Sequence, residues 1–193
     1  MKPAGAEGDR AATVEFGYTT WGMDVVRLAE PVTATVANKL LPRARSIARN
    51  GGVVLTIDGR LVRATVHRGS DASVTHIEFD PATAHLADTV RQLARTSPEP
   101  DERLHAALIG AGHNPAPTIA NVDCSCPART SMCVHVFATI YSLATRVDNS
   151  PQLALDIQDA GLSASHTPDE IGVTSWTPLH RIDVNTFYDL PPA

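Results

Sequence analysis

The sequence predicts an α+β protein, in which an antiparallel sheet of three or more strands with several helices is followed by a small metal-bound hairpin and helix. Asp58-Gly59 separates the apolar runs 53–57 and 61–66. Asp-Gly between two such runs is a strong hairpin signal, because a type I′ turn needs residues with positive φ. A second turn at 68–71 leads into a third run at 73–79. All three cysteines of the chain lie between positions 124 and 133, which indicates a metal site after the sheet.

Composition limits the classes of function. The chain has 193 residues, of which 43% are hydrophobic and 19% charged, and this balance favours a globular fold over disorder. No apolar run is long enough to span a membrane. We expect a cytoplasmic protein, because the first residues contain no apolar segment for export and a reducing compartment suits cysteines that hold a metal. The net charge of −5 argues against a protein that coats nucleic acid over its whole surface.

We expect four segments along the chain. Residues 1–12 are expected to be flexible, 13–112 to form the α+β region, 113–161 to hold the metal and the helix after it, and 162–193 to be a C-terminal extension. In the α+β region, apolar and polar residues alternate weakly over 13–18, which predicts a short strand. Trp21 is expected in the core. The segment 31–41 predicts a helix that begins with Pro31 at its first position.

The three predicted strands should bury one face. Alternation places the following side chains on that face: Val53, Leu55, Ile57, Val62, Ala64, Val66, Ile77 and Phe79. His67 and His76 are then surface or ladder residues, and metal binding by them is the less favoured alternative.

Helices are expected to follow the sheet. Asp80 and Pro81 are typical of a helix start, with Leu86, Val90 and Leu93 on the inner face. Ser97-Pro98 predicts a second start, with Leu104, Leu108 and Ile109 facing inward and an end near Gly110 or Gly112. A short helix is expected from Pro151 to Ala160. In the extension, 167–170 resembles a capping box. Its aromatic residues, which include Trp176, Phe187 and Tyr188, either pack back on the domain, the favoured interpretation, or bind a partner.

The cysteines and one histidine form the pattern C-x-C, six residues, C-x-H, at Cys124, Cys126, Cys133 and His135. Three thiolates and an imidazole are a usual donor set for a tetrahedral structural Zn²⁺ site. The first two cysteines are two residues apart and would point the same way on a strand. Phe137, Ile140, Tyr141 and Ala144 recur at helical spacing, so 134–147 predicts a helix.

The last two ligands then fall in the first turn of that helix, where the macrodipole favours thiolates. Arg129 would offset the negative charge of the site. Unligated buried cysteines and a disulfide are weaker alternatives, because the count is odd and C-x-C bridges poorly. An iron–sulfur cluster usually needs a different donor set.

One part of the chain is strongly basic. Residues 39–68 carry a net charge of +6, although the whole chain carries −5. The candidates for phosphate contacts are Lys39, Arg43, Arg45, Arg49, Arg60, Arg63 and Arg68. The alternative, which we favour at this point, is a solvated face whose charges are answered by acids elsewhere in the fold.

The metal motif resembles that of a known family. C-x-C-x(n)-C-x-H is the signature of SWIM-type zinc fingers. The sequence of bacterial SWIM zinc finger proteins around that signature is similar to this chain at residues 122–127 and 141–144, at Asp148 and at Pro151. Upstream, Trp21-Gly22 and 41–53 also resemble that family, with Ala44, Ile47 and Val134 departing from its usual residues. The resemblance implies that Cys124, Cys126, Cys133 and His135 are zinc ligands.

We expect no enzyme activity. The chain has no G-x-S-x-G, phosphate-binding glycine loop or H-E-x-x-H, and four protein donors leave zinc no open position for water. The family resemblance implies an adaptor for protein–protein interaction in DNA-related processes, with a helicase-like ATPase or another DNA-processing protein as partner. The alternative is direct binding of nucleic acid by the basic region 39–68.

Overall fold

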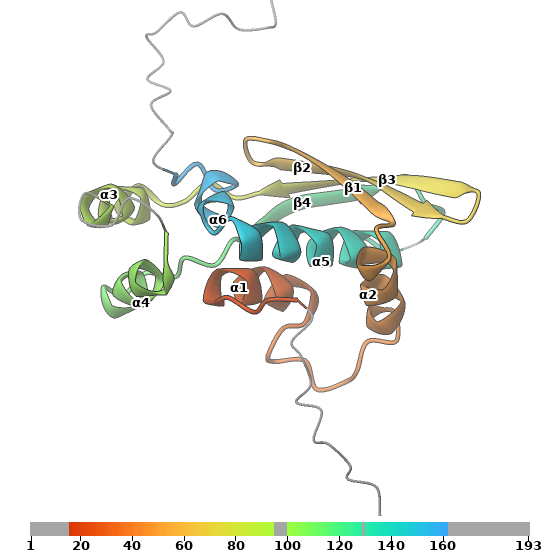
Figure 1. Ribbon diagram of the computed structural model, residues 1–193, viewed down its shortest axis with the longest axis horizontal. Coiled ribbons are helices and arrows are strands. Elements are labelled where there is room, and N and C mark those ends of the chain that lie inside the picture. The colour runs from red at the N-terminus through yellow and green to blue at the C-terminus, as the bar shows by residue number, and fades with distance from the viewer. Residues whose placement is uncertain (1–15, 95–99, 129, 162–193) are drawn as a thin grey trace, which may run out of the picture.

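Helix α5 (Val134–Asn149) lies at the centre of the fold, between the sheet and helix α1 (Thr20–Ala29), as Figure 1 shows. This computed structural model describes residues 16–94, 100–128 and 130–161. Most residues of α5 are buried, as is typical of a helix that is covered on nearly all sides. The remaining elements, in chain order, are α2 (Leu41–Arg49), β1 (Val53–Asp58), β2 (Leu61–Arg68), β3 (Asp71–Phe79), α3 (Ala84–Leu93), α4 (Glu102–Gly110), β4 (Ile119–Cys124) and α6 (Gln152–Asp156).

The sheet is antiparallel, with its four strands in the order β1-β2-β3-β4. Gly59 and Gly69 occupy the two predicted turns with φ of 52° and 62°, values that glycine adopts without strain. The predicted strands are therefore confirmed. All eight predicted inward residues belong to the core or pack against it, with those of β1 only half-buried. This face packs on α5, which is how the sheet and the central helix share one core.

The strand that carries the first cysteine belongs to the same sheet. β4 pairs with β3, and Thr75 lies opposite Cys124 in the ladder. The hairpin expected in the predicted metal-binding segment is therefore not formed by that segment alone. Its strand instead completes the sheet, and α5 continues the segment into the core.

The region before the sheet differs from expectation. Residues 16–18 form no strand, and the rest of the predicted strand lies outside the described residues. Residues 31–40 are irregular and exposed, so the helix predicted at 31–41 is wrong. The helices of this region are α1, which was not predicted, and α2, which begins at Leu41 with a proline in its first turn. Pro31 therefore follows a helix instead of starting one.

Asp148 anchors α1 to the central helix. Its buried carboxylate accepts hydrogen bonds from the backbone N–H of Gly17 (2.8 Å) and from the N–H and Oγ1 of Thr19 (both 2.9 Å). Thr19 also caps α1, because its side chain accepts a hydrogen bond from Gly22 N. Trp21 is 1% exposed, which confirms the predicted core role. The start of α1 is thus held by a residue that lies 129 positions from Thr19 in the sequence.

The later helices have the predicted inner faces but different ends. Thr83 and Asp101 are the N-caps of α3 and α4, in place of the predicted starts near Asp80 and Ser97. Ile109 is 51% exposed, so its assignment to the core is wrong. Helix α6 ends at Asp156, before the predicted end. The C-terminal extension 162–193, with its capping box and aromatic residues, lies outside the described residues. None of the described helices has both the length and the apolar character that crossing a lipid bilayer requires.

Candidate metal centre

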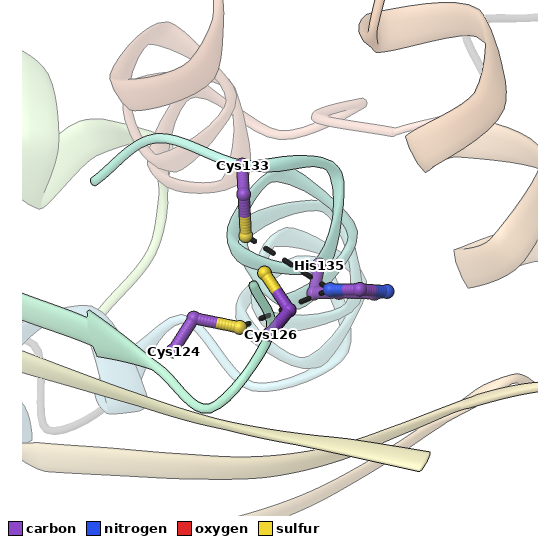
Figure 2. Close-up of side chains that lie close together, drawn as sticks. All are labelled: Cys124, Cys126, Cys133 and His135. Atoms are coloured by element: carbon purple, nitrogen blue, oxygen red, sulfur yellow. Dashed lines mark hydrogen bonds between the residues drawn. The ribbon is translucent and has the colours of Figure 1, made fainter. Parts of the chain in front are cut away.

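The three cysteines and His135 converge where β4 ends and α5 begins (Figure 2). Cys124 is the last residue of β4, and Cys126 lies two positions further, in the turn that leaves the sheet. Cys133 is the N-cap residue of α5, and His135 is in the first turn of that helix. The sequence-predicted ligands are therefore all in one place.

The distances between the ligand atoms suit a metal ion. The four atoms all lie within 4.8 Å of one another. His135 Nδ1 is 3.8 Å from Cys124 Sγ and 4.0 Å from Cys133 Sγ. Zinc bonds of standard length in a regular tetrahedron would place neighbouring ligand atoms roughly 3.5–3.8 Å apart. Small side-chain adjustments would bring the cluster to that size, so the donor set and the spacing fit Zn²⁺.

The scaffold around the cluster is held by the sheet and the helix. Ser125 N donates to Val74 O, and Val74 N donates to Ser125 Oγ, each at 2.9 Å, so the turn after Cys124 is fastened to β3. Inside, Thr139 Oγ1 donates to the carbonyl oxygen of His135 (2.9 Å) and lies 2.8 Å from Thr75 Oγ1. These bonds fix the first turn of α5 against the sheet. Cys133 and His135 are buried, whereas Cys124 and Cys126 are half-buried and pack against the core.

The protonation equilibria of the cluster show what a metal would have to change. Burial raises the pKa of Cys124 to about 12. Burial opposes ionisation of Cys126 too, but hydrogen bonds from Ala128 N–H and from the other two thiols lower its pKa. Burial, and then the charges of Arg68 and Arg43, lower the pKa of His135. The imidazole is therefore neutral and able to ligate at neutral pH, while Cys124 needs a cation to lose its proton.

Two of the predicted basic residues lie near this cluster. Arg43 on α2 and Arg68 at the end of β2 are exposed, and both act electrostatically on His135. Neither forms an ion pair within the described part of the chain. Three thiolates and one Zn²⁺ would carry a net charge of −1, and either of these two cations would offset it. Arg129, which the sequence suggested for this role, lies outside the described residues.

Other members of the basic block are engaged elsewhere. Arg45 forms an ion pair with Glu30, and its guanidinium lies 5.4 Å from the centre of the Tyr141 ring. The Tyr141 hydroxyl donates to the same glutamate. This contact joins α2 to α1 and α5, so Arg45 is a structural residue.

Arg60 and Arg63 are engaged at the sheet. Arg60 pairs with Asp159 (3.0 Å) and donates to the carbonyl oxygen of Phe79 (2.7 Å). Arg63 Nε donates to His76 Nε2 at 3.1 Å, and His67 is exposed. Lys39, which precedes α2, and Arg49, the last residue of α2, are both exposed.

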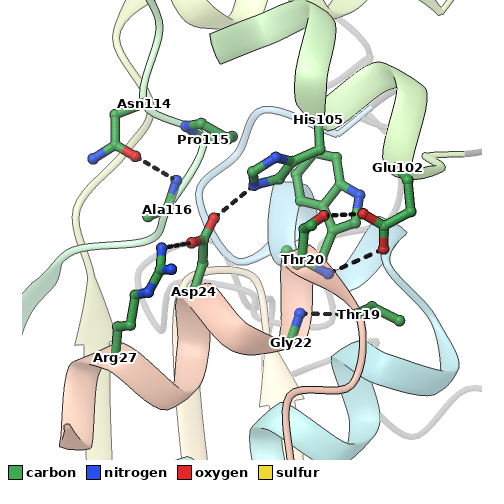
Figure 3. A network of polar contacts seen from close by, with 12 residues as sticks. Thr19, Thr20, Gly22, Asp24, Arg27, Glu102, His105, Asn114, Pro115 and Ala116 are labelled. Atoms are coloured by element: carbon green, nitrogen blue, oxygen red, sulfur yellow. Dashed lines mark hydrogen bonds and ion pairs between the residues drawn. The ribbon is translucent and has the colours of Figure 1, made fainter. Parts of the chain in front are cut away.

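Sequence reasoning missed a polar network between α1 and α4 (Figure 3). The buried Asp24 carboxylate lies 2.8 Å from His105 Nε2 and accepts a hydrogen bond from Arg27 (3.1 Å). Glu102 accepts from the N–H and hydroxyl of Thr20. About eighty positions of sequence separate the partners, and no motif marks them.

Comparisons with known proteins give one relative. The chain is 32% identical, over 168 residues, to a Mycobacterium tuberculosis protein named Uncharacterized protein Rv2102. The similarity covers 78% of this chain, and the chain spans 59% of the length of that relative. No protein-family model matches the chain, and no solved structure matches it.

Proposed function

We propose that the chain binds one Zn²⁺ through Cys124, Cys126, Cys133 and His135, as a SWIM-type zinc finger protein, and that the ion is structural. The observation that carries this proposal is the convergence of three thiols and one imidazole nitrogen within 4.8 Å, where β4 ends and α5 begins. Bound zinc would fasten the 124–133 connection between β4 and α5. Without it, the thiols have only weak contacts, with one another, with His135 Nδ1 and with the N–H of Ala128.

The proposed zinc has no catalytic role. Four protein donors fill a tetrahedral site and leave no position for an activated water. The residues of this chain would instead bind the ion and exclude water from it, with Cys133 and His135 on the buried side. We therefore propose a non-enzymatic protein.

Its biological role would be that of an adaptor for protein–protein interaction in DNA-related processes, with a helicase-like ATPase or another DNA-processing protein as partner. This follows the resemblance of the cysteine motif to SWIM proteins. The net charge of −5 and the pairing of Arg45 and Arg60 with acids favour a protein partner over a nucleic acid.

The test is cross-linking in the native cell, followed by capture of the tagged full-length chain and mass spectrometry. We expect a DNA-processing protein to be captured by the wild type and lost with the Cys133→Ser variant. Metal content of the purified wild type, prepared without chelators, should be one zinc per chain. A metal-free, fully folded wild type would contradict the zinc site, and capture that is unaffected by the variant would contradict its role in the interaction.

Direct nucleic-acid binding is the second candidate, and the placement of Arg43 and Arg68 beside the cluster favours it. If they contact phosphates, the double variant Arg43→Ala/Arg68→Ala should reduce the slope of log affinity against log salt by about two, because each lost phosphate contact removes about one unit. Gel-shift titration with duplex DNA measures that slope. Arg103→Ala, an exposed residue on α4, is the control and should change nothing. Absence of binding at low salt would exclude this candidate.

A further inference from the structure

We propose that the free edge of β1 binds an extended acidic peptide of a partner protein, which adds to the sheet as a fifth strand. This inference rests on the proposed adaptor function and names the surface and the kind of partner. Main-chain hydrogen bonds to an exposed strand edge are a common mode of peptide recognition.

The hydrogen-bond pattern shows which groups of β1 are available. β1 is at one end of the strand order and pairs with β2 alone. His67 N donates to Gly52 O at 2.7 Å, and this bond sets the alternation of the antiparallel ladder. It follows that Val53, Leu55 and Ile57 direct their N–H and C=O groups away from β2. Those groups have no hydrogen-bond partner in the described parts of the chain.

The edge lacks the features that usually prevent strand addition. Proteins protect such edges with proline, lysine, a bulge or a very short strand. β1 reads Val-Val-Leu-Thr-Ile-Asp, contains neither proline nor lysine, and pairs with β2 without a register shift. Val54 is 59% exposed on it. At the opposite edge, β4 follows an irregular register at Glu78/Phe79 and runs into the metal-binding turn.

A groove lies beside this edge, where an added strand would place its inward side chains. Its volume is about 330 Å³, and it is lined by β1, the end of α2 and one face of α5, through Ala48, Val53, Leu55, Ser142, Thr145 and Arg146. The α5 residues other than the arginine are short. They leave room for valine- or threonine-sized side chains beneath a strand that would lie about 4.8 Å from β1.

The charge of the groove favours an acidic peptide as its occupant. Arg146 is the one charged residue among the groove's described lining residues, and it is exposed. It has no ion pair with any acid of the described residues. An acidic side chain on the incoming strand would meet this cation, whereas a basic one would be repelled. A second copy of the chain is the competing occupant, and oligomeric state distinguishes the two.

The experiment uses full-length, zinc-loaded, ¹⁵N-labelled protein and two blocked peptides of alternating valine and threonine, one with a central glutamate and one with a central lysine. Amide shifts should concentrate at Val53, Leu55 and Ile57. The glutamate peptide should bind about three- to fivefold more tightly than the lysine peptide, the range of an exposed ion pair. Arg146→Glu should reverse that preference, and the matched control Arg103→Glu should retain it.

The inference would be overturned by shifts confined to other surfaces, by a preference unchanged by Arg146→Glu, or by a dimer in sedimentation whose contacts map to β1. A zinc-loaded chain that binds neither peptide also overturns it and leaves the zinc proposal standing. Conversely, peptide binding at β1 by a chain that captures no DNA-processing protein supports the edge and contradicts the proposed process.

Discussion

Cys133→Ser should release zinc from the protein and lower its stability by at least about 3 kcal/mol, a fraction of the 10–16 kcal/mol that zinc contributes to small fingers. The serine hydroxyl does not ionise near neutral pH and cannot replace a thiolate ligand. Cys133 is 2% exposed at the start of α5, so the change also leaves a polar group in the core. The loss is smaller than in an isolated finger, because the sheet and α5 retain their own core. Elemental analysis and thermal unfolding measure the two effects.

Chelation provides the complementary measurement. A strong chelator should lower the melting temperature of the wild type to near that of Cys133→Ser and should leave the variant unchanged. Ser131→Ala, an exposed position in the same connection, is the control and should keep both zinc and stability. Equal zinc content and melting in Cys133→Ser and wild type would refute the metal assignment.

The metal cluster and the meander were accessible from sequence because both are local. All four proposed ligands lie within twelve positions, and the spacing itself brings them to the end of a strand and the start of a helix. The Asp-Gly turn likewise fixes the register of β1 and β2 with no help from distant residues. Local chemistry was sufficient for these elements.

The N-terminal helices were not accessible for the opposite reason. The sequence signal at Pro31 was interpreted as a helix start, whereas α1 begins eleven positions earlier, with its entry loop held by Asp148. The basic block shows the same limit. Acids elsewhere in the fold were the favoured partners of this block, but the sequence did not indicate which ones. For Arg45 the partners are Glu30, at the end of α1, and Tyr141 of α5. Contacts between residues so far apart in the sequence leave no periodic pattern in it.

Gly22→Ala should change the stability of the protein in the opposite direction from the same substitution at an ordinary helical glycine. Gly→Ala within a helix usually stabilises by about 0.5–1 kcal/mol. At Gly22, however, a Cβ would lie 2.0 Å from Asp148 Oδ1 and 2.5 Å from its Cγ. The carboxylate cannot withdraw without losing its bonds to Gly17 and Thr19. We therefore expect Gly22→Ala to destabilise the protein by about 2–4 kcal/mol, from overpacking and lost hydrogen bonds.

Gly110→Ala is the matched control, because Gly110 ends α4 and a Cβ there would meet nothing within 4 Å. Chemical denaturation should show Gly110→Ala to be neutral or slightly stabilising and Gly22→Ala to be strongly destabilising. If the clash with Asp148 is the cause, Gly22→Ala should cost much less in an Asp148→Ala background, since the two residues are in contact and their effects should not add. Equal costs in both backgrounds would mean that the contact with Asp148 does not cause the destabilisation.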